Sequence, residues 1–310
     1  MFQQFRHHIF LPFQHCDYPL ISLLLLLVGF SQLLVVEIRT LFRFPPQDVC
    51  PHHDQRQRPE FDPKKNTTGG CVISCSAESD SRASVLDSVE TLGDDNEIVS
   101  WISRWNDTED ARQAGLLLGV DAPLLVPNNT GKRPCETTLG KRFAKFQAGA
   151  HPANRTIFGD DVRGERLVAR LAEICIRHDP YLVAPRQNNT RQVMEVFPHP
   201  AHIVLFQLAK TLKYKPKPKR TYETRWAAMN EYCRLLRSLA AFDPPLDLPD
   251  HWPPADVSGI IGSKLKQLED GLDALSCAYI VLWYWRHGEC GAEVLGDMTD
   301  GYVVIPRALG

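Results

Sequence analysis

Short hydrophobic runs that end at proline predict the buried strands of this chain. The first lies in Leu116–Pro127, read LLLGVDAPLLVP, and such a run between turn residues is typical of a buried strand in a parallel sheet. Because proline cannot donate a hydrogen bond to a sheet, the strand is expected to end near Asp121. Gln192–Phe197, read QVMEVF, repeats the pattern with one acid, Glu195, and with Pro198 directly behind it.

Both acids are therefore expected at the carboxyl ends of core strands, where open α/β sheets place their ligands. Two simpler interpretations stay open. Asp121 could only cap the turn that follows it, since Asp-X-Pro is common turn chemistry, and Glu195 could face solvent.

The remaining periodicities predict an α/β domain with a mixed sheet and helices on both faces. The chain begins with the order strand, strand, helix, strand, and helices predominate afterwards. Further strands are expected at 71–76, 84–92 and 302–305. Apolar residues at steps of three and four predict helices at 96–105, 136–147, 165–176, 201–212, 222–241 and 264–285.

The last predicted helix carries a third group of acids. Its apolar stripe consists of Leu265, Leu268, Leu272, Leu275 and Tyr279. At about 100° per residue, Glu269 and Asp273 lie one turn apart along one margin of this stripe, with Asp270 further out. Acids at such a margin either point into a cleft between helix and sheet or form a solvated flank.

Asp121, Glu195 and Asp273 together are candidates for a divalent metal site. The ends of two neighbouring strands lie about 5 Å apart, and a helix packed over them can add a further carboxylate. Crowded carboxylates repel one another unless a cation neutralises them, and Mg²⁺ and Mn²⁺ prefer oxygen ligands. Such ions can activate water for attack on a phosphodiester. We therefore predict these three residues to be catalytic and metal-binding, with Asp270 as an additional ligand.

The net charge of the chain does not favour binding to nucleic acid, so any such binding must depend on a local cluster of basic residues. The net charge is -2 over 310 residues, which gives no overall attraction to a polyanion. Lys210–Arg220, however, holds six cations and one tyrosine in eleven residues. With Lys132 and Arg133 in another loop, Lys213 and Lys215 are predicted to contact nucleic acid, the alternative being a solvated, proline-stiffened loop.

The N-terminal region differs in composition from the rest of the chain. Residues 1–60 are expected to form an irregular extension with an apolar segment at 19–36 and a polar linker, followed by one domain over 61–310. The nine cysteines lack a repeated CxxC pair, which favours free thiols and a cytoplasmic protein. The apolar segment, about 18 residues long, leaves two alternatives: membrane attachment through a signal anchor, or a buried helix.

The ordered motifs of the chain resemble a known family. GVDAPLLVPN, RPCE with LGKRF, MEVFP, LKYK, EDGLDALSCAY and GYVVIP, over roughly residues 70–310, are similar to the motifs of domain of unknown function number four hundred and twenty-nine. Its members are predicted ribonuclease H-like nucleases. The resemblance implies a ribonuclease H-like fold, Mg²⁺- or Mn²⁺-dependent hydrolysis of DNA or RNA, and an acidic set of Asp121, Glu195 and Asp273. Other polar motif positions match Arg133, Glu136, Lys213 and Lys215.

The chain departs from this pattern at its start. Ribonuclease H-like folds begin with a strand that bears a metal-binding Asp, and no Gly-Ile-Asp strand is visible before Cys71. Asp62, in Phe-Asp-Pro-Lys-Lys, is the one candidate substitute and a further candidate metal ligand; the alternative is that the first strand is absent and residues 1–60 are foreign to the domain. Two functions are therefore expected: a metal-dependent nuclease, or a catalytically impaired nucleic-acid-binding or scaffold protein that lacks the first-strand acid. The sequence does not indicate an oligomeric state.

Overall fold

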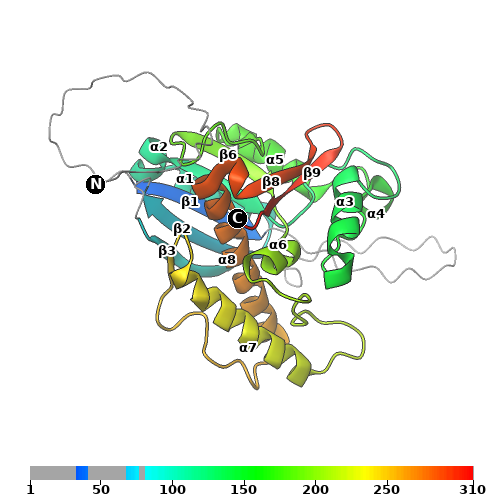
Figure 1. Ribbon diagram of the computed structural model, residues 1–310. Helices are drawn as coiled ribbons and strands as arrows, with labels where there is room; N and C mark the ends of the chain where they lie inside the picture. The colour runs from blue at the N-terminus through cyan, green and yellow to red at the C-terminus, as the bar shows by residue number, and fades with distance from the viewer. Residues whose placement is uncertain (1–32, 41–67, 77–80, 310) are drawn as a thin grey trace, which may run out of the picture. The chain divides into compact units, whose positions relative to one another are not determined.

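The chain is built around a mixed β-sheet (Figure 1). The computed structural model describes residues 33–40, 68–76 and 81–309. Within these residues a seven-stranded sheet has the order β5-β6-β4-β1-β2-β3-β7, and β8 and β9 form a separate hairpin. The strands are β1 (Leu33–Thr40), β2 (Thr68–Ser76), β3 (Ala83–Leu92), β4 (Gly115–Val120), β5 (Arg177–His178), β6 (Thr190–Glu195), β7 (Leu246–Asp247), β8 (Ala292–Asp297) and β9 (Gly301–Pro306).

The strand directions divide the sheet into two parts. β1, β2 and β3 form an antiparallel meander, whereas β4 runs parallel to β1 and β6 runs parallel to β4. Val120 is paired with Arg39 on one side and with Glu195 on the other. The carboxyl ends of β1, β4 and β6 therefore meet at one edge of the sheet, called here the carboxyl edge (Thr40, Val120 and Glu195).

The first strand comes from a stretch that its composition assigned to an irregular N-terminal extension. β1 lies within residues 1–60, and its first residues, 33–36, belong to the apolar segment 19–36. A short apolar run fits a buried strand as well as part of a longer hydrophobic segment, so periodicity does not separate these cases. Asp62 and residues 19–32 lie outside the described residues. Among the helices in the described part of the chain, none combines the length and apolar character needed to cross a bilayer.

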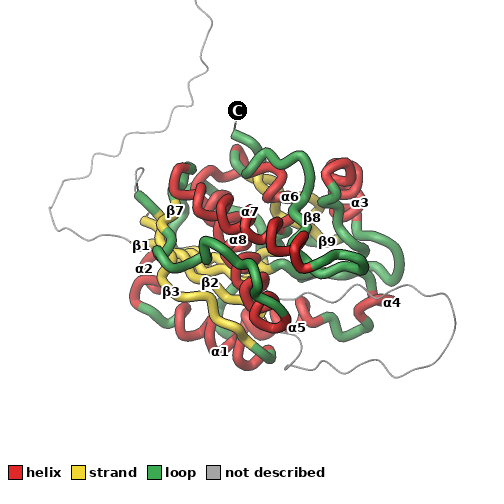
Figure 2. The backbone as a smooth tube through the Cα atoms, turned by 90° about the horizontal axis from the view of Figure 1, so that it is seen from below, coloured by secondary structure: helices red, strands yellow, loops and turns green. Residues whose placement is uncertain are grey.

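Helices cover both faces of the sheet, which confirms the predicted α/β architecture (Figure 2). The helices are α1 (Asp95–Asn106), α2 (Glu109–Ala114), α3 (Pro134–Phe143), α4 (Arg155–Phe158), α5 (Arg163–Glu173), α6 (Pro198–Leu205), α7 (Tyr222–Ser238) and α8 (Gly262–His287). The helix predicted at 201–212 begins earlier and ends at Leu205. The short elements α2, α4, β5 and β7 were not predicted because they hold too few residues to show a period. The cysteines in the described residues are free thiols, as expected.

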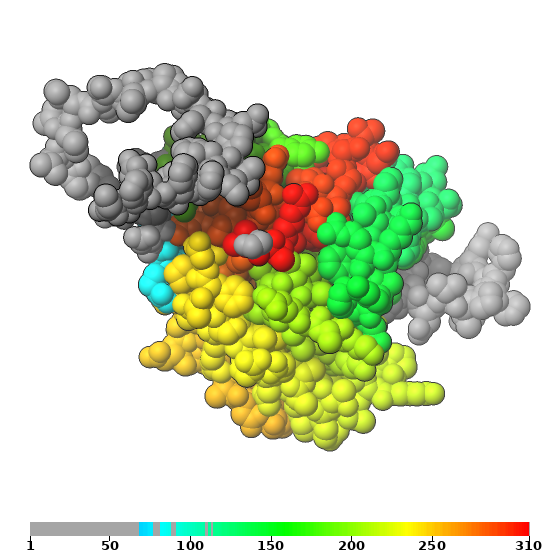
Figure 3. All heavy atoms as spheres, viewed as in Figure 1, coloured from blue at the N-terminus to red at the C-terminus, as the bar shows by residue number. Residues whose placement is uncertain are grey.

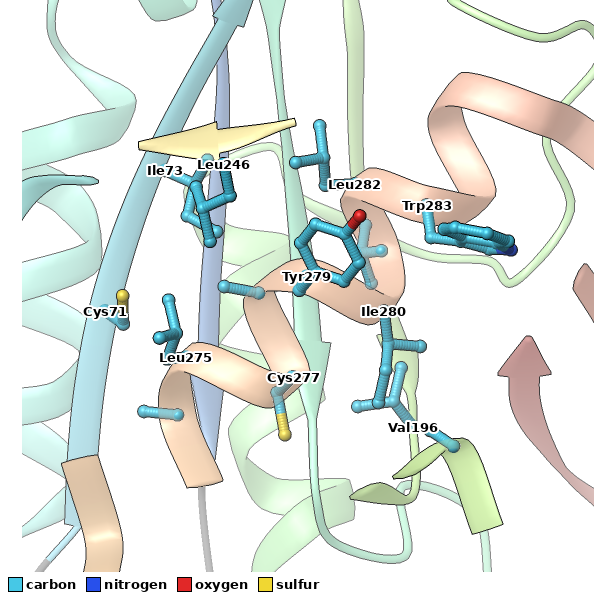
Figure 4. Close-up of a cluster of buried hydrophobic side chains, with 14 of the residues drawn as sticks. Cys71, Ile73, Val196, Leu246, Leu275, Cys277, Tyr279, Ile280, Leu282 and Trp283 are labelled. Atoms are coloured by element: carbon cyan, nitrogen blue, oxygen red, sulfur yellow. The ribbon is translucent and has the colours of Figure 1, made fainter. Parts of the chain in front are cut away.

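The largest apolar core lies between the sheet and α8 (Figure 4). Leu275 and Tyr279 of α8 belong to the same buried cluster as Ile73 of β2, and the second half of this helix is buried as predicted. The helix lies so close to the sheet that a Cβ on Gly69 would come 2.2 Å from the Asp270 carbonyl oxygen. Because Gly69 pairs with Thr40, this contact holds the acidic turn of α8 beside the carboxyl edge.

Candidate functional site

Two of the predicted acids lie at the carboxyl edge, but strand register separates them. Glu195 is level with Val120, whereas the Val196 N–H donates to the Val120 carbonyl oxygen (2.9 Å), so Asp121 is level with Val196. Consecutive residues of a strand point to opposite faces. Val120 packs in the core beneath α1 and α5, and Val196 packs in the core beneath α8. Glu195, the last residue of β6, therefore points with Val120 toward the face of α1 and α5, whereas the partly exposed Asp121 lies one position beyond the end of β4, in a bend.

Glu195 is held by a buried arginine. The Arg133 guanidinium donates through Nη1 to Oε2 (2.8 Å) and through Nη2 to Oε1 (2.6 Å), and the Leu124 N–H donates to Oε2 (3.0 Å). Burial raises the pKa of Glu195, and Arg133 opposes this effect. Burial also lowers the pKa of Arg133, but Glu195 outweighs it, so the Arg133 pKa lies above its ordinary value. The geometry is the two-pronged pairing that favours arginine over lysine.

Arg133 is in turn fixed at the start of α3. Its Nε donates to Glu136 Oε1 (2.9 Å), its backbone N–H donates to Glu136 Oε2 (3.0 Å), and the Ala153 N–H donates to both Glu136 oxygens. Gly301 has a φ of +88°, and a Cβ there would lie 2.7 Å from the Arg133 side chain. Glu195, Arg133 and Glu136, called here the arginine clamp, therefore join β6, α3 and the β8–β9 hairpin.

Asp273 occupies a second buried ion pair on the other side of the sheet. Tyr214 donates its hydroxyl to Oδ1 (2.6 Å), and the Lys215 ammonium pairs with Oδ2. Asp273 and Lys215 are buried, and Tyr232 also donates to Oδ1 at 3.3 Å. Burial raises the pKa of Asp273, but Lys215 and Tyr214 outweigh it and lower the pKa to about 2. The carboxylate is therefore charged at neutral pH and neutralised from within the chain.

A chain of hydrogen bonds leads from this pair to a buried histidine. The Tyr232 hydroxyl lies 2.5 Å from Ser276 Oγ, which lies 2.9 Å from His202 Nε2. The other ring nitrogen of His202, Nδ1, is buried and has no hydrogen-bond partner among the described residues. Burial lowers the pKa of His202 to about 4, with Asp273 opposing this effect and Lys215 adding to it. The folded protein therefore holds His202 in its neutral form.

This burial predicts a loss of stability at mildly acidic pH. A histidine in the unfolded chain titrates near pH 6.5. Between about pH 6.5 and 4, His202 is therefore protonated in the unfolded state but not in the folded state. The free energy of unfolding is therefore unaffected by His202 above this pH window, and it falls as the pH decreases through the window. From about pH 7 to pH 5 this one group is expected to remove about 2 kcal/mol. Urea unfolding of His202→Gln should show a pH dependence weaker by that amount, whereas an exposed histidine variant, His251→Gln, should match the wild type.

The remaining acids of α8 are internal as well, so the alternative of a solvated flank does not hold. Glu269 and Asp270 are both buried. Lys266 pairs with Asp270 from the preceding turn, and Arg225 Nη2 lies 3.7 Å from Glu269 Oε2. Sequence reasoning missed Tyr214, Tyr232, Ser276 and His202 as partners of this acidic turn. The spacing of residues gives no signal for contacts between segments so far apart in the chain.

The described acids do not fit a Mg²⁺ or Mn²⁺ site. Within 33–40, 68–76 and 81–309, no group of three or more Asp, Glu, His or Cys side chains is placed to hold a metal. Both oxygens of Glu195 already accept hydrogen bonds from Arg133, and those of Asp273 accept from Tyr214 and Lys215. In β1 the one acidic residue is Glu37, whose backbone is level with Leu118, three residues or about 10 Å before Asp121.

The predicted nucleic-acid contacts divide into two kinds. Arg133 and Lys215 are buried and serve as internal partners of acids, as described above. Lys132 and Lys213 are exposed. Lys132 donates to the Ala150 carbonyl oxygen (3.2 Å), which holds its side chain along α3. Only these two of the four predicted residues are therefore accessible to a ligand.

Comparison with known proteins supplies the family of the chain. No curated protein and no solved structure matches it significantly. The family described as "Protein of unknown function (DUF429)" matches residues 61–298, which includes every described element from β2 to α8. The motif order predicted this family, and the match confirms it. The chain is therefore a member of the DUF429 family.

Proposed function

We propose that this protein is a ribonuclease H-like nucleic-acid-binding protein that engages the phosphate backbone through exposed lysines. Two observations support the ribonuclease H-like assignment. The domain begins with an antiparallel meander, β1 to β3, and continues with the parallel strands β4 and β6 on the other side of β1. The long last helix, α8, then packs across β1, β2 and β4.

The observation that carries the proposal is a surface of lysines drawn from two separate segments. We call it the basic surface; it consists of Lys132, Lys141, Lys145, Lys210 and Lys213, all exposed. The Thr211 N–H donates to the Phe146 carbonyl oxygen (2.8 Å), which joins the segment after α6 to the 3-10 turn after α3. Figure 3 shows these two segments, in yellow-green and green, side by side on one face of the molecule.

Glu293, an acid near this surface, is paired with an arginine, and the turn of the β8–β9 hairpin lies at the Lys132 end of α3. Glu293 pairs with Arg142 at 2.6 Å, so neither is counted in the basic surface. The turn of the β8–β9 hairpin lies against the first turn of α3, where a Cβ on Gly296 would be 3.0 Å from Cys135. Lys141 lies in the last turn of that helix, and Lys145 follows its end. The basic surface therefore presents a local positive field on a chain whose net charge is only -2.

Fluorescence anisotropy with labelled oligonucleotides tests this proposal. The wild type is expected to bind at roughly 50 mM salt and to weaken steeply toward 200 mM, because phosphate contacts release counterions. Replacing Lys141, Lys145, Lys210 and Lys213 by Gln should weaken binding at least about tenfold and flatten the salt dependence. A charge-neutralising control on the other face of the sheet, Arg104→Gln with Arg112→Gln, should bind like the wild type. Equal loss in both variants would contradict the proposal.

Metal-dependent hydrolysis of a phosphodiester is the second candidate function. It is favoured by the meeting of the carboxyl ends of β1, β4 and β6, with Asp121 directly behind β4. It is opposed by the neutralisation of Glu195 and Asp273 within the chain. Under the first proposal, the protein with Mn²⁺ binds an end-labelled oligonucleotide without cleaving it. If the wild type cleaves the oligonucleotide, and Asp121→Asn still binds it but no longer cleaves it, the protein is a metal-dependent nuclease and the first proposal is wrong.

A further inference from the structure

We infer that the ligand of the basic surface is single-stranded nucleic acid, with an unpaired base stacked on an aromatic platform at the start of α7. The platform consists of Tyr222, Trp226 and Ile261. This inference rests on the proposed function and adds the strandedness of the ligand to it.

The platform presents an aromatic and aliphatic surface to solvent. Tyr222 and Ile261 are exposed to 39% and 56%, and both are among the large hydrophobic residues that the described structure leaves open. The Tyr222 and Trp226 rings stack with their centroids 5.7 Å apart and an interplanar angle of 29°. Exposed stacked aromatic rings are the features on which proteins bind bases without sequence preference.

Hydrogen bonds hold the platform rigid. The Trp226 Nε1 donates to the Ile260 carbonyl oxygen (2.7 Å), and the Gly262 N–H donates to the Tyr222 hydroxyl (3.3 Å). These two bonds connect the start of α7 to the segment that precedes α8. The rings are therefore held in place before a ligand arrives, which reduces the entropy lost on binding.

The platform adjoins the same basic segment that contributes to the basic surface. Lys217 and Lys219 are exposed and precede Tyr222 by a few residues. The Arg225 guanidinium lies 5.4 Å from the centroid of the Tyr222 ring, and its Nε donates to the Tyr214 carbonyl oxygen (2.9 Å). Lysines that track phosphates, next to a ring on which a base stacks, match the chemistry of a single strand.

The access of its bases distinguishes a single strand from a duplex at this platform. Paired bases in a duplex are stacked on one another, so their faces cannot reach Tyr222. A duplex is therefore expected to use the lysines alone, whereas a single strand uses the lysines and the ring.

The test compares the affinities of the full-length protein for single-stranded and double-stranded DNA. Labelled oligothymidylate of about 16 nucleotides and a mixed-sequence DNA duplex of similar length are titrated by anisotropy. The wild type should bind the single strand about tenfold or more tightly than the duplex. Tyr222→Ala should weaken single-strand binding about five- to 100-fold and leave duplex binding within about twofold. Tyr222→Phe, which keeps the ring, should retain tight binding. Tyr181→Ala, at another exposed tyrosine, should change neither affinity.

The outcomes separate this inference from the proposed function. If the lysine variant loses binding but Tyr222→Ala affects both ligands equally or not at all, the single-strand inference is wrong and the proposed function stands. If the wild type binds neither oligonucleotide, both are wrong. Circular dichroism and urea unfolding of Tyr222→Ala identify any loss caused by misfolding, and Tyr222→Phe then decides the case through the retained ring.

Discussion

Arg133→Met is expected to lower the free energy of unfolding by about 3–5 kcal/mol. The substitution keeps the volume of the side chain but removes the cation between two buried carboxylates, Glu195 and Glu136. A buried charge that loses its partner retains its full desolvation cost, so the loss exceeds the net contribution of the pair itself. The Arg133 Nε also holds Glu136, whose carboxylate accepts from the Ala153 N–H. The first turn of α3 and the loop that meets it at Ala153 should therefore loosen when the guanidinium is removed.

Urea unfolding followed by circular dichroism measures this effect, and α3 itself provides the control. Arg142 also pairs with a glutamate, but its side chain is 43% exposed. Arg142→Met should therefore cost about 0.5 kcal/mol or less. A loss in Arg133→Met no larger than that in Arg142→Met would mean that the arginine clamp does not stabilise the fold. A second check is Glu195→Gln, which keeps the side-chain volume and one acceptor oxygen and should cost less than Arg133→Met.

Asp273→Asn is expected to lower the free energy of unfolding by about 3 kcal/mol without any divalent ion present. The amide still accepts a hydrogen bond from Tyr214, but Lys215 is left as a buried cation without its anionic partner. The exposed ion pair on α7 is the comparison, and Glu231→Gln should cost about 0.5 kcal/mol or less. The measurement is again urea unfolding, repeated with a chelator and with excess Mg²⁺.

The same experiment separates the two roles considered for Asp273. As the partner of Lys215, the residue stabilises the fold equally in chelator and in Mg²⁺. As a metal ligand, it would give the wild type a Mg²⁺-dependent increase in melting temperature that Asp273→Asn lacks. That increase would contradict the internal ion pair and favour the nuclease function.

Predictions from local pattern agree with much of the structure. The apolar runs before Pro123 and Pro198 form β4 and β6, and the apolar stripe from Leu265 onward forms α8. These elements follow from properties that act within a few residues: proline ends a ladder, and a 3.6-residue period buries one helical face. The position of Asp121 and Glu195 at the ends of neighbouring strands follows from the same signals.

The first strand shows where local pattern is insufficient. An apolar run such as residues 33–36 is equally compatible with a strand, a membrane segment and a buried helix. Its composition therefore does not select among these structures. Their assignment to β1 depends on pairing with β2 and β4, which are supplied by residues far along the chain. The pairing partner, and not the segment itself, decides that β1 belongs to the sheet.

The sequence by itself determined the family, the α/β class, the two strand-end acids and the acidic turn of α8. Only the tertiary structure decided what those acids contact. Arg133 reaches Glu195 across 62 positions, and Lys215 reaches Asp273 across 58. The register of β4 and β6 places Glu195 level with Val120, so that Asp121 lies one position beyond it, outside the strand. The reason is that secondary structure reflects forces between near neighbours, whereas the partner of a buried charge is fixed by how whole elements pack.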